Sequence, residues 1–305
     1  MKNLTIEVRN LDVIYKKILP VSEQNVAIKD MSFELEPGKV YGLIGRNGAG
    51  KTSLLSILAN FRSSSRGEVL INGENLFDNS KYSQDIQFIY QKEFSTDSGD
   101  TYPKLIKYIK RETEFRPNFD LEYALELVKK FNLPTNKRPH RLSKGQQSAL
   151  SVVIGLASRT PVTIFDEAYL GMDAPTRDLF YKEVLVDQER YPRTIIMSTH
   201  LVSEMEYLFD EVIMIDKGEL LMKGAYDEII ASALAITGPS EEVDRFVAGR
   251  PSFNTEFLGG YKKVMLQATL SEKEISQLKN SSLEVSQLSL QDLFIGLTGG
   301  VACGE

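Results

Sequence analysis

The stretch YGLIGRNGAGKTSLLSIL, Tyr41 to Leu58, joins a short apolar run to an apolar helix through eight residues that contain three glycines and a lysine. The run Val40 to Ile44 is typical of a buried strand, because it is short, apolar and bounded by glycine-rich sequence. The segment after the glycines predicts a helix, with apolar residues recurring at Leu54, Leu55 and Leu58. The pattern therefore predicts a strand, a tight loop and a helix in immediate succession.

The loop GRNGAGKT fits G-x-x-x-x-G-K-[ST] at Gly45, Gly50, Lys51 and Thr52. Glycines let the backbone fold into a nest whose N–H groups point at anionic oxygens, and the following helix adds the positive end of its dipole. Lys51 is placed to reach the β- and γ-phosphates, and the Thr52 hydroxyl to bind Mg²⁺. The alternative is a glycine turn that merely opens a helix. The flanking strand and helix favour a nucleoside triphosphate site.

Composition limits what else the chain can be. Its 305 residues can hold one large domain and a small one, and its 36 basic and 42 acidic residues give a net charge of −6. That balance argues against non-specific nucleic-acid binding, which requires a basic face. The single cysteine, Cys303, predicts a reducing cytosol, and the N-terminus carries no signal peptide. The longest uncharged stretch, Gly145 to Ser158, is too short to cross a bilayer, so any work at a membrane requires a partner.

Two further apolar strands end in groups that can act on a phosphate. PVTIFDEA ends in Asp166 and Glu167, which are expected near Mg²⁺ and an attacking water. RTIIMSTH ends at His200, one of only two histidines, at the carboxyl end of a strand, where α/β sheets bind ligands. The alternatives are acidic residues at the solvent end of a strand and a structural histidine. Beside the glycine loop, we favour a role at the γ-phosphate.

The segment HRLSKGQQSALSVVIGLAS opens a second long apolar helix after a Leu-Ser-x-Gly-Gln run. Ser143 is expected to be the N-cap of this helix. A second helix start that can bind an anion, in a chain with one phosphate loop, indicates contact with phosphate bound to another molecule.

Together these segments resemble the ATP-binding cassette family, the nucleotide-binding subunits of ABC transporters, over about residues 4 to 230. By that resemblance GRNGAGKT is the Walker A motif and VTIFDE the Walker B motif. FIYQ supplies the Q-loop glutamine, LSKGQ the signature motif, and LGMD the D-loop with Asp173. The resemblance implies an α/β P-loop cassette with a helical subdomain, and ATP and Mg²⁺ as cofactors.

The resemblance also implies roles for single residues. Catalytic roles fall on Glu167, His200 and Gln91, and Mg²⁺ binding falls on Thr52, Gln91 and Asp166. Nucleotide binding is implied for a larger set of residues in the Walker A and signature motifs: Asn47, Gly48, Gly50, Lys51, Thr52, Ser53, Ser143, Gly145 and Gln146. Tyr15 is expected to stack on adenine, an interaction worth on the order of 1–3 kcal/mol; a core tyrosine is the alternative.

Some positions depart from the family pattern. Lys144 replaces the commoner glycine of the signature motif, with Ser148 and Ala149 where many members are basic. Tyr169 and Leu170 precede the D-loop in place of a frequent Pro/Ser/Thr-rich approach. None of these changes removes a catalytic group, so an active ATPase is expected.

The family mechanism implies that two cassettes pair head to tail around two ATP molecules. The Walker A motif of one subunit then faces Ser143 and Gly145 of the other. ATP-driven closure and reopening would drive a separate membrane permease. Because the chain has one cassette, a homodimer or a pair with a homologue is expected, in the cytoplasm on the inner face of the cell membrane.

The sequence divides into a cassette at 1–231, with a helical subdomain at about 92–158, and an accessory unit at 232–298. Apolar residues at helical spacing mark the subdomain: Leu105, Ile109, Leu121, Leu125 and Val128. The accessory unit reads as β-α-β-β-α-β, compatible with a ferredoxin-like module, with a capping box at Ser271 and Glu274. Its role, packing or dimerisation and regulation, stays open. Residues 299–305 are expected to be disordered.

Three segments outside the phosphate loop indicate the class of transporter. RPNFD, DEAYLGMDAPTR and SLQDLFIGLT resemble ATPases that export antibiotics, bacitracin or antimicrobial peptides. An importer ATPase is disfavoured because the accessory unit does not resemble the β-barrel appendage common there. The alternative from another class is a soluble mechanochemical ATPase not coupled to transport. A P-loop kinase would leave LSKGQ unexplained.

Overall fold

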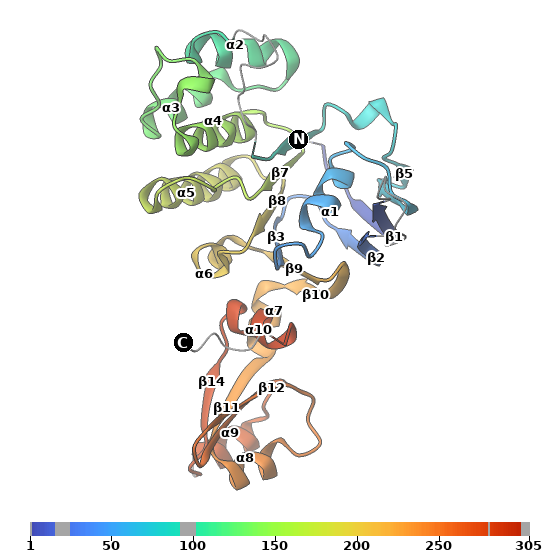
Figure 1. Ribbon diagram of the computed structural model, residues 1–305, viewed down its shortest axis with the longest axis vertical. Helices are drawn as coiled ribbons and strands as arrows, with labels where there is room; N and C mark the ends of the chain where they lie inside the picture. Colours follow the sequence, from blue (N-terminus) through green and yellow to red (C-terminus); the bar gives the residue numbers. More distant parts are fainter. Residues whose placement is uncertain (1, 16–24, 92–101, 280, 300–305) are drawn as a thin grey trace.

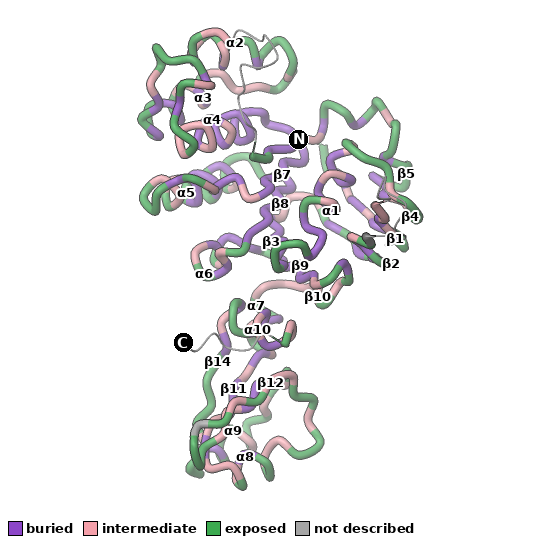
Figure 2. The backbone as a smooth tube through the Cα atoms, in the orientation of Figure 1, coloured by how far each residue is buried: buried purple, intermediate pink, exposed green. Residues whose placement is uncertain are grey.

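The computed structural model describes residues 2–15, 25–91, 102–279 and 281–299. The molecule is elongated: helices α2 and α3 lie at one end, a large mixed region follows, and a smaller unit built from the last quarter of the chain lies at the other end (Figure 1). Figure 2 shows buried residues running through the central strands between these ends.

A six-stranded sheet forms the centre of the molecule, in the order β10-β9-β3-β8-β7-β6. Five neighbouring strands are parallel, and β10 pairs antiparallel with β9 at one edge. Each central strand is almost entirely buried, as parallel strands covered on both faces must be. The strands are β3 (Val40–Gly45), β6 (Ile86–Ile89), β7 (Val162–Asp166), β8 (Thr194–Thr199), β9 (Glu211–Asp216) and β10 (Glu219–Ala225).

The register of this sheet brings the predicted chemistry together. Ile44 pairs with Thr199 and Asp166 pairs with Ser198, so β3, β7 and β8 end at one edge of the sheet. The three strands expected from the sequence are therefore confirmed and adjacent. Groups that follow them, from the glycine loop to His200, share that edge.

A second, antiparallel sheet covers one side of the helix that follows the glycine loop. Its order is β2-β1-β4-β5, and α1 (Lys51–Leu58) lies between it and the central sheet (Figure 1). Apolar residues of α1 join one core cluster with residues of both sheets, including Leu54, Ile6 and Ile164. The strands are β1 (Ile6–Tyr15), β2 (Asn25–Leu35), β4 (Arg66–Ile71) and β5 (Glu74–Asn75), followed by the short 3₁₀ helix η1 (Ser80–Tyr82).

Helices pack on the opposite side of the central sheet, and α3, α4 and α5 carry side-chain caps at their N-termini. Asp120, Ser143 and Asp173 each accept a hydrogen bond from a backbone N–H of the first turn. Ser143 forms a full capping box with Gln146, which confirms the predicted N-cap. These elements are α2 (Leu105–Phe115), α3 (Leu121–Lys130), η2 (Pro139–Arg141), α4 (Lys144–Ala157), α5 (Ala174–Arg190), α6 (Val202–Met205) and η3 (Glu206–Leu208).

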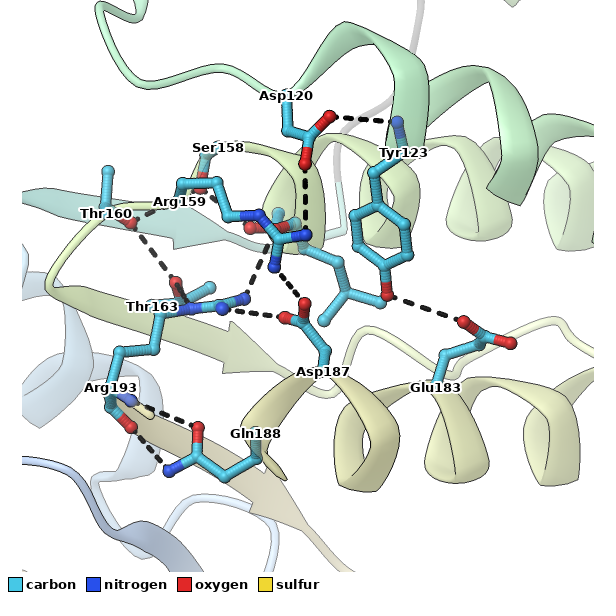
Figure 3. A network of polar contacts seen from close by, with 12 residues as sticks. Asp120, Tyr123, Ser158, Arg159, Thr160, Thr163, Glu183, Asp187, Gln188 and Arg193 are labelled. Atoms are coloured by element: carbon cyan, nitrogen blue, oxygen red, sulfur yellow. Dashed lines mark hydrogen bonds and ion pairs between the residues drawn. The ribbon is translucent and has the colours of Figure 1, made fainter. Parts of the chain in front are cut away.

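A buried ionic network ties three of these elements to the central sheet (Figure 3). Asp187 of α5 forms ion pairs with Arg159, just after α4, and with Arg193, just before β8, the latter at 2.6 Å. Arg159 also reaches Asp120 at the start of α3, at 3.2 Å, and Arg193 donates to Thr163 of β7 at 3.3 Å. Burial lowers the pKa of Arg193. The network fixes where α3, α4 and α5 stand relative to β7 and β8.

The last quarter of the chain forms a third sheet, in the order β12-β13-β11-β14, with all pairs antiparallel. Its element order is β-α-β-β-α-β, and Ser271 and Glu274 hydrogen-bond each other as a capping box at the start of α9. The elements are α7 (Tyr226–Ser232), β11 (Ala233–Pro239), α8 (Ser240–Val247), β12 (Ser252–Leu258), β13 (Tyr261–Gln267), α9 (Glu272–Lys279), β14 (Glu284–Gln287) and α10 (Leu290–Leu297).

Helix α10 leads back from this sheet to the cassette. Leu293 and Phe294 belong to the same core cluster as Met205 and Leu208, and the backbone N–H of Leu290 donates to Glu206 at 3.3 Å. One apolar core cluster therefore extends across the boundary that is expected near residue 231. Residues 92–101 of the expected helical subdomain and 300–305 of the expected tail lie outside the described residues.

None of the helices in the described ranges combines the length and the apolar character that a bilayer crossing requires.

Candidate functional site

A cavity of about 520 Å³ opens at the edge of the central sheet where β3 and β7 end. Residues from both sheets, the glycine loop and the segment after β6 form its walls. They are Tyr15, Ala27, Arg46, Asn47, Gly48, Gly50, Lys51, Thr52, Ser53, Tyr90, Gln91, Asp166, Glu167 and Leu170. Its volume is within the range of small-molecule and cofactor sites.

The backbone of the loop requires glycine at two positions. Gly48 has a φ of 82° and Gly50 a φ of 106°, both in the left-handed region that glycine adopts without strain. A Cβ on Gly50 would also lie 2.4 Å from the carbonyl oxygen of Ala27 on β2. The loop thus curls tightly against β2 at the start of α1, the kind of backbone nest that is suited to bind an anion.

Lys51, the first residue of α1, supplies a cation at the floor of the cavity. Its side chain is 6% exposed, and Nζ donates to the carbonyl oxygens of Gly45 at 2.7 Å and Arg46 at 3.3 Å. The same nitrogen lies 3.3 Å from Oε1 of Glu167. A buried ammonium beside a nest of N–H groups is suited to bind a polyanion.

Thr52 and Asp166 form an oxygen pair that fits a hard divalent cation. The Thr52 hydroxyl donates to Oδ2 of Asp166 at 2.8 Å, and the Ser198 hydroxyl donates to Oδ1 at 2.6 Å. Within the described residues no three His, Cys, Asp or Glu side chains converge as a metal cage. Mg²⁺ commonly binds to one or two protein oxygens together with substrate phosphates. The donor set fits Mg²⁺ on that basis.

Glu167 and His200 meet beside this pair. Glu167 has a φ of 47°, an uncommon conformation for a residue other than glycine, and its backbone N–H donates to Ser198 at 2.9 Å. Nδ1 of His200 lies 3.3 Å from Oε1 of Glu167 and 3.1 Å from the Tyr169 hydroxyl. Burial raises the pKa of Tyr169. The kinked backbone after β7 turns the Glu167 carboxylate toward both Lys51 and His200.

Tyr15 and Gln91 lie at the cavity wall, as expected from the sequence. The Tyr15 hydroxyl hydrogen-bonds with Ser53 at 2.9 Å, and the guanidinium of Arg62 lies 4.6 Å from its ring centroid. Gln91 is exposed and also borders a small neighbouring hollow that includes Lys144 and Ser148. Tyr15 thus lines the cavity at the end of β1 and also packs against a core cluster, so its stacking on adenine stays a prediction.

Ser143, Gly145 and Gln146 do not line this cavity. Ser143 is exposed at the start of α4, and a Cβ on Gly145 would lie 2.5 Å from the carbonyl oxygen of Gly171 before α5. Their expected contact is with nucleotide on another molecule, and that stays a prediction.

Sequence reasoning missed several wall residues. Arg46 and Tyr90 are neighbours of motif residues and could have been included on that ground. Ala27 lies far away in sequence and reaches the site only because β2 passes under the loop, so no local signal marked it. The contact of Tyr169 with His200 likewise arises only from the packing of the loop after β7 against β8.

The chain is similar in sequence to known ATP-binding proteins of transporters. A family model described as ABC transporter matches residues 28–170. The ABC transporter ATP-binding protein YtrB of Bacillus subtilis is 25% identical over 279 residues, which cover 90% of this chain and 94% of YtrB. The putrescine export system ATP-binding protein SapF of Escherichia coli is 28% identical over 80% of this chain and 92% of its own length.

A solved structure gives the same fold. The dimeric post-hydrolysis state of an ATP-binding cassette bound to ADP and Pi aligns with a TM-score of 0.63 at 20% identity, over 72% of this chain and 98% of that one. The predicted cassette fold is confirmed.

Proposed function

This chain carries an ABC transporter ATP-binding domain, and on that premise we propose that it binds and hydrolyses ATP to drive a transporter. One observation carries the proposal: a single cavity holds the glycine loop, the Thr52–Asp166 oxygen pair and the carboxylate of Glu167. These are the parts that phosphoryl transfer to water requires, since catalysis there is mostly positioning and charge stabilisation.

Different residues of the cavity bind the phosphates, the adenine and Mg²⁺. The loop N–H groups and Lys51 bind the β- and γ-phosphates, while Asn47, Gly48, Gly50 and Ser53 shape the loop around them. Tyr15 stacks on the adenine. Thr52 and Asp166, with Gln91, hold Mg²⁺, which supplies charge neutralisation when bound.

Two groups act at the γ-phosphate itself. Glu167 orients the attacking water and takes its proton, and His200 donates a hydrogen bond to the γ-phosphate. Because Glu167 lies within 3.3 Å of both Lys51 and His200, the carboxylate, the ammonium and the imidazole form one connected cluster.

We further propose that two such chains, or this chain and a homologue, close around two ATP molecules. Ser143, Gly145 and Gln146, at the start of α4, do not line the cavity within one chain. A head-to-tail pair would bring that helix start onto the ATP of the other subunit. The capped helix N-terminus is suited to contact a phosphate.

The partner that uses this motion is, in our proposal, a separate membrane permease, with the chain on the cytoplasmic face of the membrane. Export of a drug or an amphipathic or antimicrobial peptide is supported by the similarity of RPNFD, DEAYLGMDAPTR and SLQDLFIGLT to exporter ATPases. No nucleic-acid partner is proposed, given the net charge of −6. A soluble mechanochemical ATPase is the alternative.

The first experiment compares ATP turnover of the wild type and Glu167→Gln, with size-exclusion chromatography of both in ATP and Mg²⁺. General bases typically contribute about 10²- to 10⁴-fold, so we expect the variant to lose at least about 100-fold in turnover. We also expect it to accumulate as an ATP-dependent dimer. Glu228→Gln, at an exposed position on α7, should match the wild type in both assays.

Wild-type turnover by the Glu167 variant would contradict the assigned base. If neither protein turns over or dimerises, the chain needs a partner cassette or permease to complete its sites. A pull-down from native membranes tests the transport role. An integral membrane protein that binds the trapped variant, but not the wild type in ADP, would favour transport over the soluble alternative.

A further inference from the structure

Tyr169 occupies a position that the catalytic scheme does not use. It lies in the loop after β7, two residues beyond Glu167, with its side chain 2% exposed and its ring in the core cluster. It does not line the cavity, yet its hydroxyl lies 3.1 Å from Nδ1 of His200. The ring centroids of the two residues are 5.8 Å apart.

The hydrogen bonds around that hydroxyl determine the direction of its proton. The backbone N–H of Leu201 donates to the Thr199 hydroxyl at 2.9 Å, so this hydroxyl directs its own proton elsewhere, to Tyr169 at 3.2 Å. The backbone N–H of His200 donates to the same tyrosine oxygen, also at 3.2 Å. Both lone pairs of the tyrosine oxygen are then occupied, and its one proton points to Nδ1 of His200.

A proton donated to Nδ1 has a consequence for the imidazole. Nδ1 must be the acceptor, so the ring proton of neutral His200 lies on Nε2. Glu167 opposes this arrangement, because its carboxylate, 3.3 Å from Nδ1, would favour a proton on Nδ1 instead. The tyrosine contact is the shorter of the two, and in the described ranges the Tyr169 hydroxyl has no other acceptor for its proton.

We propose that Tyr169 is a positioning residue that holds neutral His200 as the Nε2–H tautomer. This inference rests on the proposed function. In this tautomer Nε2–H is the donor to the γ-phosphate, and the ring proton is not held on Nδ1 by a hydrogen bond to Glu167. Tyr169 thereby acts on hydrolysis through His200, without touching the nucleotide.

The test uses the low histidine content of the chain. With only His140 and His200, histidine-selective ¹⁵N labelling gives two imidazoles, and His140→Gln assigns them. Two-bond ¹H–¹⁵N spectra at about pH 8.5, roughly two units above the usual imidazole pKa, report the neutral tautomer. We expect Nε2–H in the wild type and a shift toward Nδ1–H in Tyr169→Phe, which keeps the ring.

Tyr181→Phe is the matched control. Tyr181 is a buried tyrosine of α5 whose hydroxyl hydrogen-bonds to nothing in the described part of the chain. Its variant should leave the His200 signals unchanged. A thermal melt of each variant checks that the fold is kept.

An Nδ1–H tautomer or an imidazolium in the wild type would overturn the proposal, as would identical His200 signals in the wild type and Tyr169→Phe. ATP turnover adds a second arm. We expect kcat of Tyr169→Phe to fall about three- to tenfold, as for loss of one neutral hydrogen bond, with KM for ATP unchanged. If the isolated wild type hydrolyses no ATP, as expected when a partner cassette or permease must complete its sites, the spectra still decide the role of Tyr169.

Discussion

Gly50 shows how a single missing side chain shapes the site. An alanine there would carry left-handed strain of about 1–2 kcal/mol. Its Cβ would also have to move away from the Ala27 carbonyl, 2.4 Å away. We therefore expect Gly50→Ala to lower the free energy of unfolding by more than the strain alone and to weaken nucleotide binding. Urea unfolding and titration with a fluorescent ATP analogue measure the two effects.

Gly38→Ala separates strain from the close approach. Gly38 has a φ of 84° and open space around its Cβ position. We expect its variant to lose only about 1–2 kcal/mol and no nucleotide affinity. If both variants lost the same free energy of unfolding, the close approach of the loop to β2 would add nothing to the effect of Gly50→Ala.

At the scale of helices and strands, the Asp187 network holds α3, α4 and α5 in place against β7 and β8. Asp187→Asn leaves Arg159 and Arg193 buried without their shared countercharge. Removing one partner of a buried pair typically costs about 3–5 kcal/mol, so we expect a loss of that order in urea unfolding.

Asp178→Asn on the same helix is the control. Asp178 pairs with Lys182, but its side chain is 54% exposed. Such surface pairs contribute about 0–1 kcal/mol, so this variant should unfold close to the wild type. A similar small loss for Asp187→Asn would mean that the network adds no net stability.

The cap of α9 gives a prediction about pH. Hydrogen bonds from Ser271, and then Arg250, lower the pKa of Glu274 from 4.5 to about 2. A lowered pKa stabilises the fold above pH 4.5, and that contribution is lost as pH falls toward about 2. Carboxyl ¹³C titration should place Glu274 near 2.

Ser271→Ala tests the largest single cause. It removes the hydrogen bond of the serine hydroxyl and keeps that of the Ser271 backbone N–H, so the pKa of Glu274 should rise from about 2 but stay below 4.5. An unchanged pKa would contradict the hydroxyl as the main cause.

Local signals explain which elements the sequence could predict. The strands that end at Asp166 and before His200, the N-cap at Ser143 and the capping box at Ser271 each depend on a few neighbouring residues. They appear in the structure where expected. Contacts between distant segments carry no such signal. Gly50 against Ala27 and Asp187 between two arginines follow from the register of strands and helices, which no short window encodes.

At the scale of the whole molecule, α10 joins the accessory unit to the cassette. Leu293 is buried in the cluster that also contains Leu208 and Met205. We expect Leu293→Ala to cost about 2–5 kcal/mol and to lower the melting temperature of the ATP-binding region itself. Calorimetry with and without ATP and Mg²⁺ identifies which transition moves.

Ile275→Ala, on α9 of the same unit, is the matched change at a 42% exposed position and should have a small effect. If Leu293→Ala leaves the ATP-sensitive transition unchanged, the two parts fold independently.

The return of α10 to the cassette also has a consequence for synthesis on the ribosome. Leu290 follows Glu206, its hydrogen-bond partner, by 84 residues. At roughly 5–20 residues per second, translation needs roughly 4–17 s to make that stretch. During this interval the nascent cassette exposes the apolar surface of α6 and η3 that α10 later covers. A chaperone that recognises apolar segments would therefore find its binding site there, and only until α10 emerges.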